Sequence, residues 1–289
     1  MTTHTAPPPA LQDARLALRD FLDQHHRIFV LTGAGVSTNS GIPDYRDADG
    51  QWKRQQPIEY AAFMRDALMR ARYWARSVVG WRSFGQASPN AAHQALARLE
   101  QVGRIGLLVT QNVDGLHQAA GSHRVVDLHG RLERVRCMSC QLVLPRADWQ
   151  RQLEQLNPTW VGLDAAVAPD GDADLEGLDF ATFEVPPCPR CGGIIKPDVV
   201  FFGERVPPWR HAQASASLET SDAVLVAGSS LMVYSGYRYV RTAARLGLPI
   251  AAVNLGRTRA DDLLTVKVED DVAATLASVV PGAPPASPA

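Results

Sequence analysis

The chain has 289 residues, of which 46% are hydrophobic and 20% charged, and its 29 lysines and arginines nearly balance its 30 aspartates and glutamates, for a formal net charge of −1. This composition supports a substantial core and argues against an intrinsically disordered chain or a small disulfide-stapled protein. The near-zero net charge disfavours a nucleic-acid coat or a membrane-surface protein, since both need a basic excess, and no apolar run approaches the length of a membrane span.

The two ends of the chain, residues 1–10 and 281–289, are rich in Pro and Ala without periodicity, and we expect them to be disordered tails. The N-terminus shows neither an apolar signal core nor an Arg-rich amphipathic transit helix, so we expect a cytoplasmic protein. From Leu11 to His26, apolar residues recur at three- and four-residue steps, which predicts an amphipathic helix. This helix leads into RIFVLTGAG (27–35), a run typical of a buried parallel strand that ends at a tight turn.

Three more short apolar runs predict buried strands, each beside a stretch of helical period: IGLLVT (105–110), AVLVA (223–227) and PIAAVN (249–254). Strands that alternate with helices predict an α/β fold with a doubly wound, Rossmann-like parallel sheet. We expect this part to be built from three segments, about residues 11–43, 91–130 and 197–280. The intervening segments, about 44–90 and 131–196, break the alternation and are expected to form a smaller zinc-binding and helical module.

A glycine-rich segment, GAGVSTNSGIPDYR, runs from Gly33 to Arg46 directly after the first predicted strand. Closely spaced small residues let the backbone approach a pyrophosphate, and a following helix start offers unpaired N–H groups. An ordinary strand-to-helix turn would look similar, and Thr38 replaces the third glycine of the dehydrogenase fingerprint. The segment therefore favours a dinucleotide site without the usual geometry for hydride transfer.

Four cysteines form two C-x-x-C pairs, Cys137 with Cys140 and Cys188 with Cys191. Two such pairs supply four thiolates at the spacing of a tetrahedral zinc site, and the Gly-Gly after the second pair suits the turn of a zinc ribbon. A redox dithiol is the alternative for a single pair. Because four thiolates leave no open coordination position, the predicted zinc is structural rather than catalytic.

Polar and small residues follow the predicted strands, where ligands collect in a doubly wound sheet. A cluster of amide, carboxylate and imidazole side chains, residues 111–117, follows the second strand, and His129 with Gly130 follows RVVD. A histidine at such a place can act as a general base near neutral pH, although a histidine that only caps or packs would look the same. Small polar turns also follow the two later strands: Gly228-Ser229-Ser230 and Asn254-Leu255-Gly256.

The order of these motifs resembles the sirtuins, the NAD-dependent protein lysine deacylases. The resemblance rests on GAGVSTNSGIPDYR, TQNVDGLH, the LHG around His129, both C-x-x-C pairs, KPDVVFFGE, GSSL and NLG. It implies a sirtuin-type catalytic domain over about residues 11–280, with NAD as co-substrate and one structural Zn²⁺. Within the family the chain is similar to class II, the group of the fourth human sirtuin and its bacterial relatives, in RYWARSVVGW (72–81), LNPTW (156–160), APDGD (168–172) and VYSGYR (233–238).

The resemblance also implies residue roles. His129 would be the general base, with Asn112 as the second catalytic residue. The ADP-ribose part of NAD would contact Gly33, Ala34, Gly35, Ser37, Gly228, Ser229, Ser230, Asn254, Leu255, Gly256 and Val272. A mobile cofactor loop would hold Pro43, Asp44, Tyr45 and Arg46, while the nicotinamide ribose would contact Gln111 and Asn112, and the carboxamide Val113 and Asp114. The acyl-lysine tunnel would be lined by Val200, Phe201 and Phe202, and the substrate backbone would pair with Gly203 and Glu204 as an added strand.

In the implied reaction, the acyl oxygen attacks the ribose carbon that carries nicotinamide, a step that needs a positioned nucleophile and a dry pocket. His129 then takes a proton from a ribose hydroxyl, which attacks the acyl carbon, and hydrolysis yields lysine and O-acyl-ADP-ribose.

Tyr73 and Arg76 share one face of a predicted helix, and a similar Tyr-x-x-Arg pair in class III sirtuins binds a succinyl-type carboxylate. We hypothesise that this pair favours acidic or longer acyl groups; a solvated Arg76 is the alternative.

Four other functions were weighed against the sequence. A mono-ADP-ribosyltransferase or a delipoylase would use the same fold, and a zinc-bearing NAD dehydrogenase would yield reduced cofactor. A zinc-ribbon module that binds nucleic acid is disfavoured by the net charge and by the lack of a basic aromatic stripe in 131–196. We expect acyl-lysine proteins as substrates and neither nucleic acid nor membrane as partner, with no prediction of oligomeric state.

Overall fold

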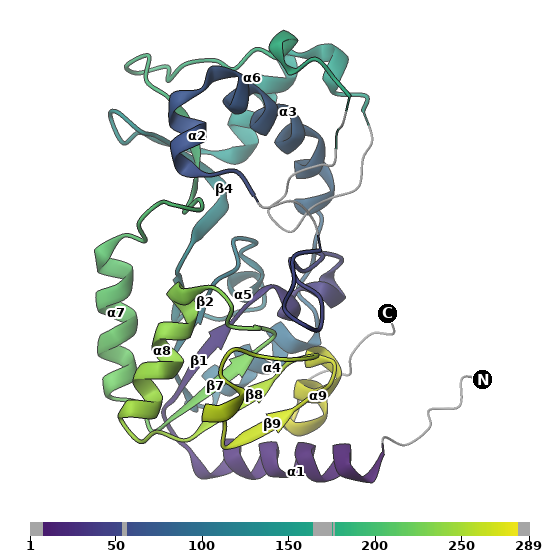
Figure 1. The fold of residues 1–289 in the computed structure, drawn as a ribbon, viewed down its shortest axis with the longest axis vertical. Coiled ribbons are helices and arrows are strands. Elements are labelled where there is room, and N and C mark those ends of the chain that lie inside the picture. Colours follow the sequence, from purple (N-terminus) through teal and green to yellow (C-terminus); the bar gives the residue numbers. More distant parts are fainter. Residues whose placement is uncertain (1–7, 54–56, 164–174, 176, 283–289) are drawn as a thin grey trace, which may run out of the picture.

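Two sheets organise the chain in the computed structural model, which describes residues 8–53, 57–163, 175 and 177–282. The larger sheet has six strands in the order β3-β2-β1-β7-β8-β9, and the smaller has three in the order β5-β4-β6. Figure 1 shows the larger sheet in the lower part of the molecule and the smaller module, with α2, α3 and α6, above it. The predicted α/β fold with a smaller module is confirmed.

The strands of the larger sheet are all parallel. They are β1 (Ile28–Thr32), β2 (Ile105–Thr110), β3 (Val125–Asp127), β7 (Ala223–Ala227), β8 (Ile250–Val253) and β9 (Val266–Val268). Ile28 and Val30 of β1 point into one core, and Phe29 and Leu31 into the other. The strands read as continuous apolar runs because helices cover both faces of the sheet.

Helices pack on each face of this sheet (Figure 1). One face carries α1 (Pro9–Gln24), α4 (Ala91–Gln101) and α9 (Val272–Val279), and the other α7 (Pro208–Glu219) and α8 (Tyr234–Arg245). A short α5 (Leu116–Ala119) follows β2. Helix α1 begins at Pro9, two residues inside the segment expected to be a tail, because proline suits the first helical position. In the described ranges, no helix combines the length and apolarity needed to cross a bilayer.

The chain reverses its winding between β1 and β7. From β1 the sheet grows through β2 and β3 on one side, and from β7 through β8 and β9 on the other. The carboxyl ends of β1 and β7 therefore meet at the switch point, where ligands of doubly wound folds bind. The amide of Gly33 donates to Ala227 O at 3.2 Å, and the amide of Gly35 to Gly228 O at 2.9 Å. Two 3₁₀ helices (Ala34–Val36 and Thr38–Ser40) follow β1 in place of the expected α-helix start.

The smaller module has an antiparallel sheet that the sequence analysis did not predict. Its strands are β4 (Gly130–Cys137), β5 (Val143–Pro145) and β6 (Ile195–Val199), and its helices α2 (Tyr60–Arg65), α3 (Ala67–Phe84) and α6 (Arg146–Leu156). The 3₁₀ helices Pro158–Trp160, Phe180–Thr182 and Asp261–Leu263 complete the described elements. Trp74 and Trp149 lie in the core of the smaller module, with ring centroids 5.7 Å apart. The segment APDGD (168–172) lies outside the described residues.

The boundary between the two parts differs from the expected one at residue 196. Lys196 and Pro197 pair with Arg136 and Val135 of β4, so β6 continues the small sheet to Val199. The segment that leaves β6 therefore starts from the smaller module. This places residues 200–204 at the junction with the larger sheet.

Candidate active site

A cavity of about 400 Å³ lies at the carboxyl ends of β1, β2, β7 and β8 and extends to the smaller module. Most of the residues predicted to contact NAD line it: Gly33, Ala34, Gly35, Ser37, Asp44, Tyr45, Arg46, Gln111, Asn112, Val113, Asp114, Gly228, Ser229, Ser230, Asn254 and Leu255. His129 and all of residues 200–204 line the same cavity. Among the described residues with a predicted NAD contact, Pro43, Gly256 and Val272 lie outside this lining.

Three glycines form one wall of the cavity without side chains. A Cβ on Gly33 would lie 2.8 Å from the Cβ of Ser229, and one on Gly35 would lie 3.0 Å from the Cα of Gly228. Gly228 has a φ of +62°, and a Cβ there would lie 2.2 Å from the amide nitrogen of Val36. Only glycine fits at these close approaches, so the wall presents bare backbone, as a pyrophosphate site requires.

Three polar side chains that line the cavity, Ser37, Asn112 and Asp114, are joined by hydrogen bonds. Ser37 Oγ donates to Asp114 Oδ2 at 2.8 Å, and Asn112 Nδ2 donates to Ser37 Oγ at 3.0 Å. The amide of Leu116 donates to the other carboxylate oxygen at 2.9 Å. Burial raises the pKa of Asp114, and these hydrogen bonds oppose the rise. Because each polar group has a fixed partner, the amide and the carboxylate are oriented before a ligand arrives.

His129 occupies the two-residue link between β3 and β4. Its Nδ1 lies 2.9 Å from Gln111 O and its Nε2 lies 2.8 Å from Ser235 Oγ. Burial lowers the pKa of His129 to about 4; the hydrogen bond with Gln111 opposes this shift, and the charges of Arg210 and His211 add to it. The imidazole is therefore neutral at physiological pH and can accept a proton.

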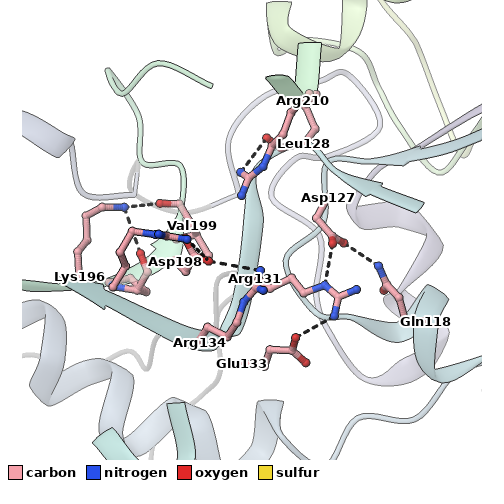
Figure 2. A network of polar contacts seen from close by, with 12 residues as sticks. Gln118, Asp127, Leu128, Arg131, Glu133, Arg134, Lys196, Asp198, Val199 and Arg210 are labelled. Atoms are coloured by element: carbon pink, nitrogen blue, oxygen red, sulfur yellow. Dashed lines mark hydrogen bonds and ion pairs between the residues drawn. The ribbon is translucent and has the colours of Figure 1, made fainter. Parts of the chain in front are cut away.

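Charged residues brace the backbone on both sides of His129 (Figure 2). Arg131 Nε donates to Asp127 Oδ2 at 2.7 Å, which links the start of β4 to the end of β3. Arg210 Nη1 donates to Leu128 O at 3.4 Å. His129 is therefore held by its neighbours in the chain as well as by the hydrogen bonds of its own ring.

The segment after β6 is fixed by a buried ion pair. Lys196 Nζ lies 3.0 Å from Glu204 Oε2, and the same oxygen accepts from the amide of Phe201 at 2.9 Å. The ammonium also lies 4.5 Å from the ring centroid of Phe201 and donates to Val199 O, the contact visible in Figure 2. Burial lowers the pKa of Lys196 and the charge of Glu204 opposes this. The predicted substrate segment is thus tied back onto its own strand.

The four cysteines gather at the far end of β4. Their sulfur atoms all lie within 4.8 Å of one another, with Cys137 and Cys191 at 3.5 Å and Cys140 and Cys188 at 3.8 Å. A tetrahedral metal with sulfur bonds of about 2.3 Å places its sulfurs roughly 3.8 Å apart, whereas a disulfide needs about 2.05 Å. The cluster therefore fits Zn²⁺ and does not fit a pair of disulfides.

Comparison with known proteins identifies the family. The Sir2 family description matches residues 33–235. The chain belongs to the Sir2 family, the sirtuins. A relative called NAD-dependent protein deacetylase in Bordetella pertussis is 67% identical over 265 residues, which cover 92% of this chain and 97% of the relative. The NAD-dependent protein lipoamidase sirtuin-4 of Bos taurus is 46% identical over 267 residues, covering 91% of this chain and 85% of the relative. The resemblance drawn from the motifs is confirmed.

Solved sirtuin structures share the fold. One described as Sir2-p53 peptide-NAD+ aligns with a TM-score of 0.72 at 32% identity, over 91% of this chain and 95% of that one. Another, described as Sir2Tm bound to a propionylated peptide, aligns with a TM-score of 0.73 at 32% identity, over 91% and 96% of the two chains. The arrangement of sheet and module is therefore that of the sirtuins.

The loop expected to cover the cofactor in this sirtuin lies across the cavity. The guanidinium of Arg46 lies 4.0 Å from the ring centroid of Trp52, and Tyr45 meets the same ring edge-on at 6.1 Å. Trp52, which the sequence analysis did not single out, also contacts Phe202 at 5.7 Å. The loop rests on Gly256, where a Cβ would lie 2.5 Å from Ala48 O. Gly256 therefore supports the loop instead of lining the cavity.

Val272 and Pro43 also lie outside the lining. Val272 is the first residue of α9 and packs in the core of the large sheet. Its neighbour Asp271 caps the helix by accepting from the amide of Ala274 at 2.7 Å. Helix α9 contacts the 3₁₀ helix Ala34–Val36 of the glycine-rich segment.

His93 is a site residue that the sequence analysis missed. Its Nδ1 accepts from the amide of Asn90 at 3.3 Å, so Nε2 carries the proton and donates to Ser37 Oγ at 3.4 Å. Burial lowers the pKa of His93 to about 4, and its ring centroid lies 4.8 Å from that of His117, which bonds Thr32 Oγ1 at 2.9 Å. The Asn-x-x-His spacing at the start of α4 was the available signal, because Asn90 is the N-cap.

Another part of the cavity lining was also missed. Met232, Val233, Tyr234 and Ser235 line the cavity between β7 and α8. All of these except Met232 belong to the segment VYSGYR (233–238), which entered the sequence analysis only as a mark of class II.

Tyr73 and Arg76 of α3 occupy different surroundings. Tyr73 lines the cavity and packs edge-on against Phe201 at 5.2 Å and Phe63 at 5.5 Å. Arg76 is half-buried and is not among the described residues that line the cavity. Of the two residues, Tyr73 alone is therefore placed at the cavity by the described part of the chain.

Proposed function

We propose that this sirtuin is an NAD-dependent protein lysine deacylase that transfers the acyl group to ADP-ribose and releases nicotinamide. One observation carries the proposal: a neutral histidine with an accepting Nε2 shares a single cavity with the bare-backbone glycine wall and the aromatic wall of Phe201. The names of the Bordetella and bovine relatives support the same reaction class.

The cofactor site fits NAD, which when bound supplies the electrophilic ribose carbon and the nicotinamide leaving group. The glycine wall holds the pyrophosphate, and Asn112 with Asp114 orients the nicotinamide half through their fixed hydrogen bonds. His129 takes a proton at Nε2, because Gln111 O keeps the other ring nitrogen protonated. Gly203 and Glu204 present backbone to the substrate peptide, and the aromatic walls exclude water.

The metal site fits one Zn²⁺ with a purely structural role. Cys137, Cys140, Cys188 and Cys191 fill a tetrahedral shell and leave no position for substrate. The metal would therefore join the two C-x-x-C segments of the smaller module. The proton transfer is assigned to His129.

The test is a reaction of acyl-lysine peptides with NAD, followed by mass spectrometry. We expect free nicotinamide, deacylated peptide and O-acyl-ADP-ribose in equal amounts, and we expect His129→Ala to lose deacylation. Reduced cofactor would indicate a dehydrogenase, and an ADP-ribosylated protein would indicate a transferase. Deacylation that survives His129→Ala at the wild-type rate would contradict the assignment.

A second proposal concerns the acyl group, for which longer or acidic chains are favoured over acetyl. It is supported by the aromatic side wall at Tyr73 and by the lipoamidase name of the bovine relative. The Tyr73 and Arg76 pair is tested with acetyl, lipoyl, succinyl and glutaryl peptides on wild type, Tyr73→Phe and Arg76→Ala. An acyl preference that Arg76→Ala leaves unchanged would remove Arg76 from the site, and Tyr73→Phe tests the hydroxyl alone.

We also propose the setting in which the enzyme acts. The relatives from Bordetella support a bacterial enzyme. Its proposed compartment is the cytoplasm, and its proposed substrates are acyl-lysine proteins rather than nucleic acid or membranes. Fractionation of cells that express the tagged chain tests the compartment. Recovery with the membrane fraction would contradict it.

A further inference from the structure

The accepting nitrogen of His129 already has a partner in the protein. A backbone carbonyl can only accept, so the contact between Nδ1 and Gln111 O at 2.9 Å places the proton on Nδ1. Nε2 then offers a single lone pair, and Ser235 Oγ lies 2.8 Å from it. The serine hydroxyl must therefore donate its hydrogen to the nitrogen that the reaction uses.

The position of Ser235 is fixed by the same residue that fixes the imidazole. Ser235 lies in the first turn of α8, and its neighbour Gly236 packs so closely on Gln111 that a Cβ would lie 2.6 Å from Oε1. The amide of Gly236 also donates to Val233 O at 3.2 Å. Gln111 thus anchors the serine backbone through its side chain and the histidine ring through its carbonyl. A hydroxyl held in this way keeps its distance to Nε2 while its hydrogen stays free to transfer.

We propose that Ser235 is a catalytic residue that relays the proton from the substrate hydroxyl to His129. Both side chains line the cavity, and a hydroxyl can accept one hydrogen while it donates another. This proposal rests on the proposed deacylase function, in which a ribose hydroxyl must lose its proton.

The relay balances without a further reactant. The bond between Ser235 Oγ and its hydrogen breaks as that hydrogen bonds to Nε2, and the ribose O–H bond breaks as its hydrogen bonds to Ser235 Oγ. Serine ends as a neutral hydroxyl and His129 as an imidazolium with protons on both nitrogens. The electron pair left on the ribose oxygen forms the new bond to the imidate (former acyl) carbon, and the π pair of its C=N bond moves onto the substrate nitrogen.

The competing arrangement is one in which the serine hydroxyl turns away and the ribose hydroxyl contacts Nε2 directly. In that case Ser235 competes with substrate, so its removal would leave deacylation unchanged or faster. The relay predicts the opposite sign. One substitution therefore separates the two arrangements.

The experiment compares wild type with Ser235→Ala and with Ser235→Thr, which keeps a hydroxyl. We expect Ser235→Ala to lower the single-turnover rate constant of deacylation by about 100-fold. Nicotinamide exchange should continue near the wild-type rate, because it precedes the proton transfer, and Ser235→Thr should recover most of the deacylation rate. A proton inventory in mixed H₂O and D₂O should be curved for wild type, as two protons move together, and linear for Ser235→Ala.

A readout that needs no turnover checks the geometry. In the enzyme without ligands, the ¹⁵N resonance of His129 Nε2 should report a hydrogen-bonded acceptor in wild type and Ser235→Thr and an unbonded one in Ser235→Ala. Equal melting temperatures show that the variants fold. Wild-type or faster deacylation by a folded Ser235→Ala overturns the relay alone. A wild-type enzyme that releases no nicotinamide with any acyl peptide overturns the proposed function and the relay with it.

Discussion

At the scale of the residue, a histidine base works only while its accepting nitrogen is unprotonated, so its surroundings decide the pH range of the enzyme. The burial of His129 and the nearby positive charge of Arg210 both disfavour the imidazolium, and the pKa falls from its ordinary value to about 4. The same burial gives His93 a pKa of about 4. Both rings are therefore neutral across the whole physiological range.

We predict that deacylation shows no acidic limb near pH 6.5, where an ordinary histidine titrates. Protonation removes the base only as pH falls through about 4, so kcat/KM should stay flat from pH 8 to 6 and decline below that range. The measurement is a pH profile with stability checked by preincubation. Arg210→Met, which removes a neighbouring positive charge, should move the limb to higher pH. A wild-type limb centred near 6.5 would be inconsistent with this burial.

A second prediction at this scale concerns Gly228. Gly228→Ala combines a φ of +62° with a Cβ only 2.2 Å from Val36 N, so we expect NAD affinity to fall by at least about tenfold and stability by about 1 to 3 kcal/mol. Gly103→Ala is the matched control, since its φ is +79° but nothing lies within 4 Å of its Cβ. Calorimetry with NAD should show weak binding only for Gly228→Ala. Equal affinities in both variants would remove the glycine wall from the cofactor site.

At the scale of the element, the segment after β6 depends on one strand residue. Lys196 is buried on β6 and reaches both the carboxylate of Glu204 and the ring of Phe201. Breaking a buried ion pair strands a charge, which costs far more than breaking an exposed one. The segment proposed to bind the substrate peptide, residues 200–204, should therefore lose its conformation when this lysine is removed.

We predict that Lys196→Met raises the KM for acyl peptide by about tenfold and destabilises the fold by about 3 kcal/mol. The KM for NAD should change little, because the glycine wall lies on the other sheet. The double variant Lys196→Met/Glu204→Gln should recover part of the stability. Lys267→Met, which breaks the more exposed pair with Asp261 at 2.9 Å, should cost less than about 1 kcal/mol. Equal costs for the two lysines would refute the role of burial.

The sequence predicted some strands of the fold correctly and missed others. β1, β2, β7 and β8 were predicted because they are buried on both faces and read as unbroken apolar runs. β4 escaped because its register shifts between Gly130 and Val135, so its inward residues Leu132 and Val135 are an odd number of positions apart. A bulge of this kind breaks the alternation by which a strand is recognised.

At the scale of the whole molecule, the metal cluster and the base lie at opposite ends of one strand. β4 begins at Gly130, next to His129, and ends at Cys137, and eight residues of strand span roughly 20 Å. The cluster cannot touch the reacting atoms over that distance. It can only hold the strand that leads to them.

We predict one tightly bound zinc per chain, whose removal by a chelator lowers the melting temperature and the deacylation rate together. NAD binding should weaken less than deacylation, because the glycine wall lies on the large sheet. Cys188→Ser should reproduce the effect of the chelator. Atomic emission, thermal melting and calorimetry measure these outcomes. A loss of activity with an unchanged melting temperature would indicate a catalytic metal.

The candidate site was predicted where it rests on local motifs and missed where it rests on contacts between distant residues. The glycine turn, the cysteine pairs and His129 each stand in a short recognisable segment. His93 and Ser235 act through hydrogen bonds to Ser37 and His129, which are 56 and 106 positions away in the chain. Such partners emerge only when the strands are brought together.

His129 lies in the short link between the last residue of β3, in the parallel sheet, and the first residue of β4, in the antiparallel sheet. Asp127 ends β3 of the parallel sheet and Gly130 begins β4 of the antiparallel one, while Tyr73 of α3 packs in the core of the smaller module. Substitutions in the smaller module can therefore change which acyl chain is accepted without altering how the cofactor is held. A lineage can in this way diversify its substrates while its chemistry stays constant, and the relatives of this chain include one named deacetylase and one named lipoamidase.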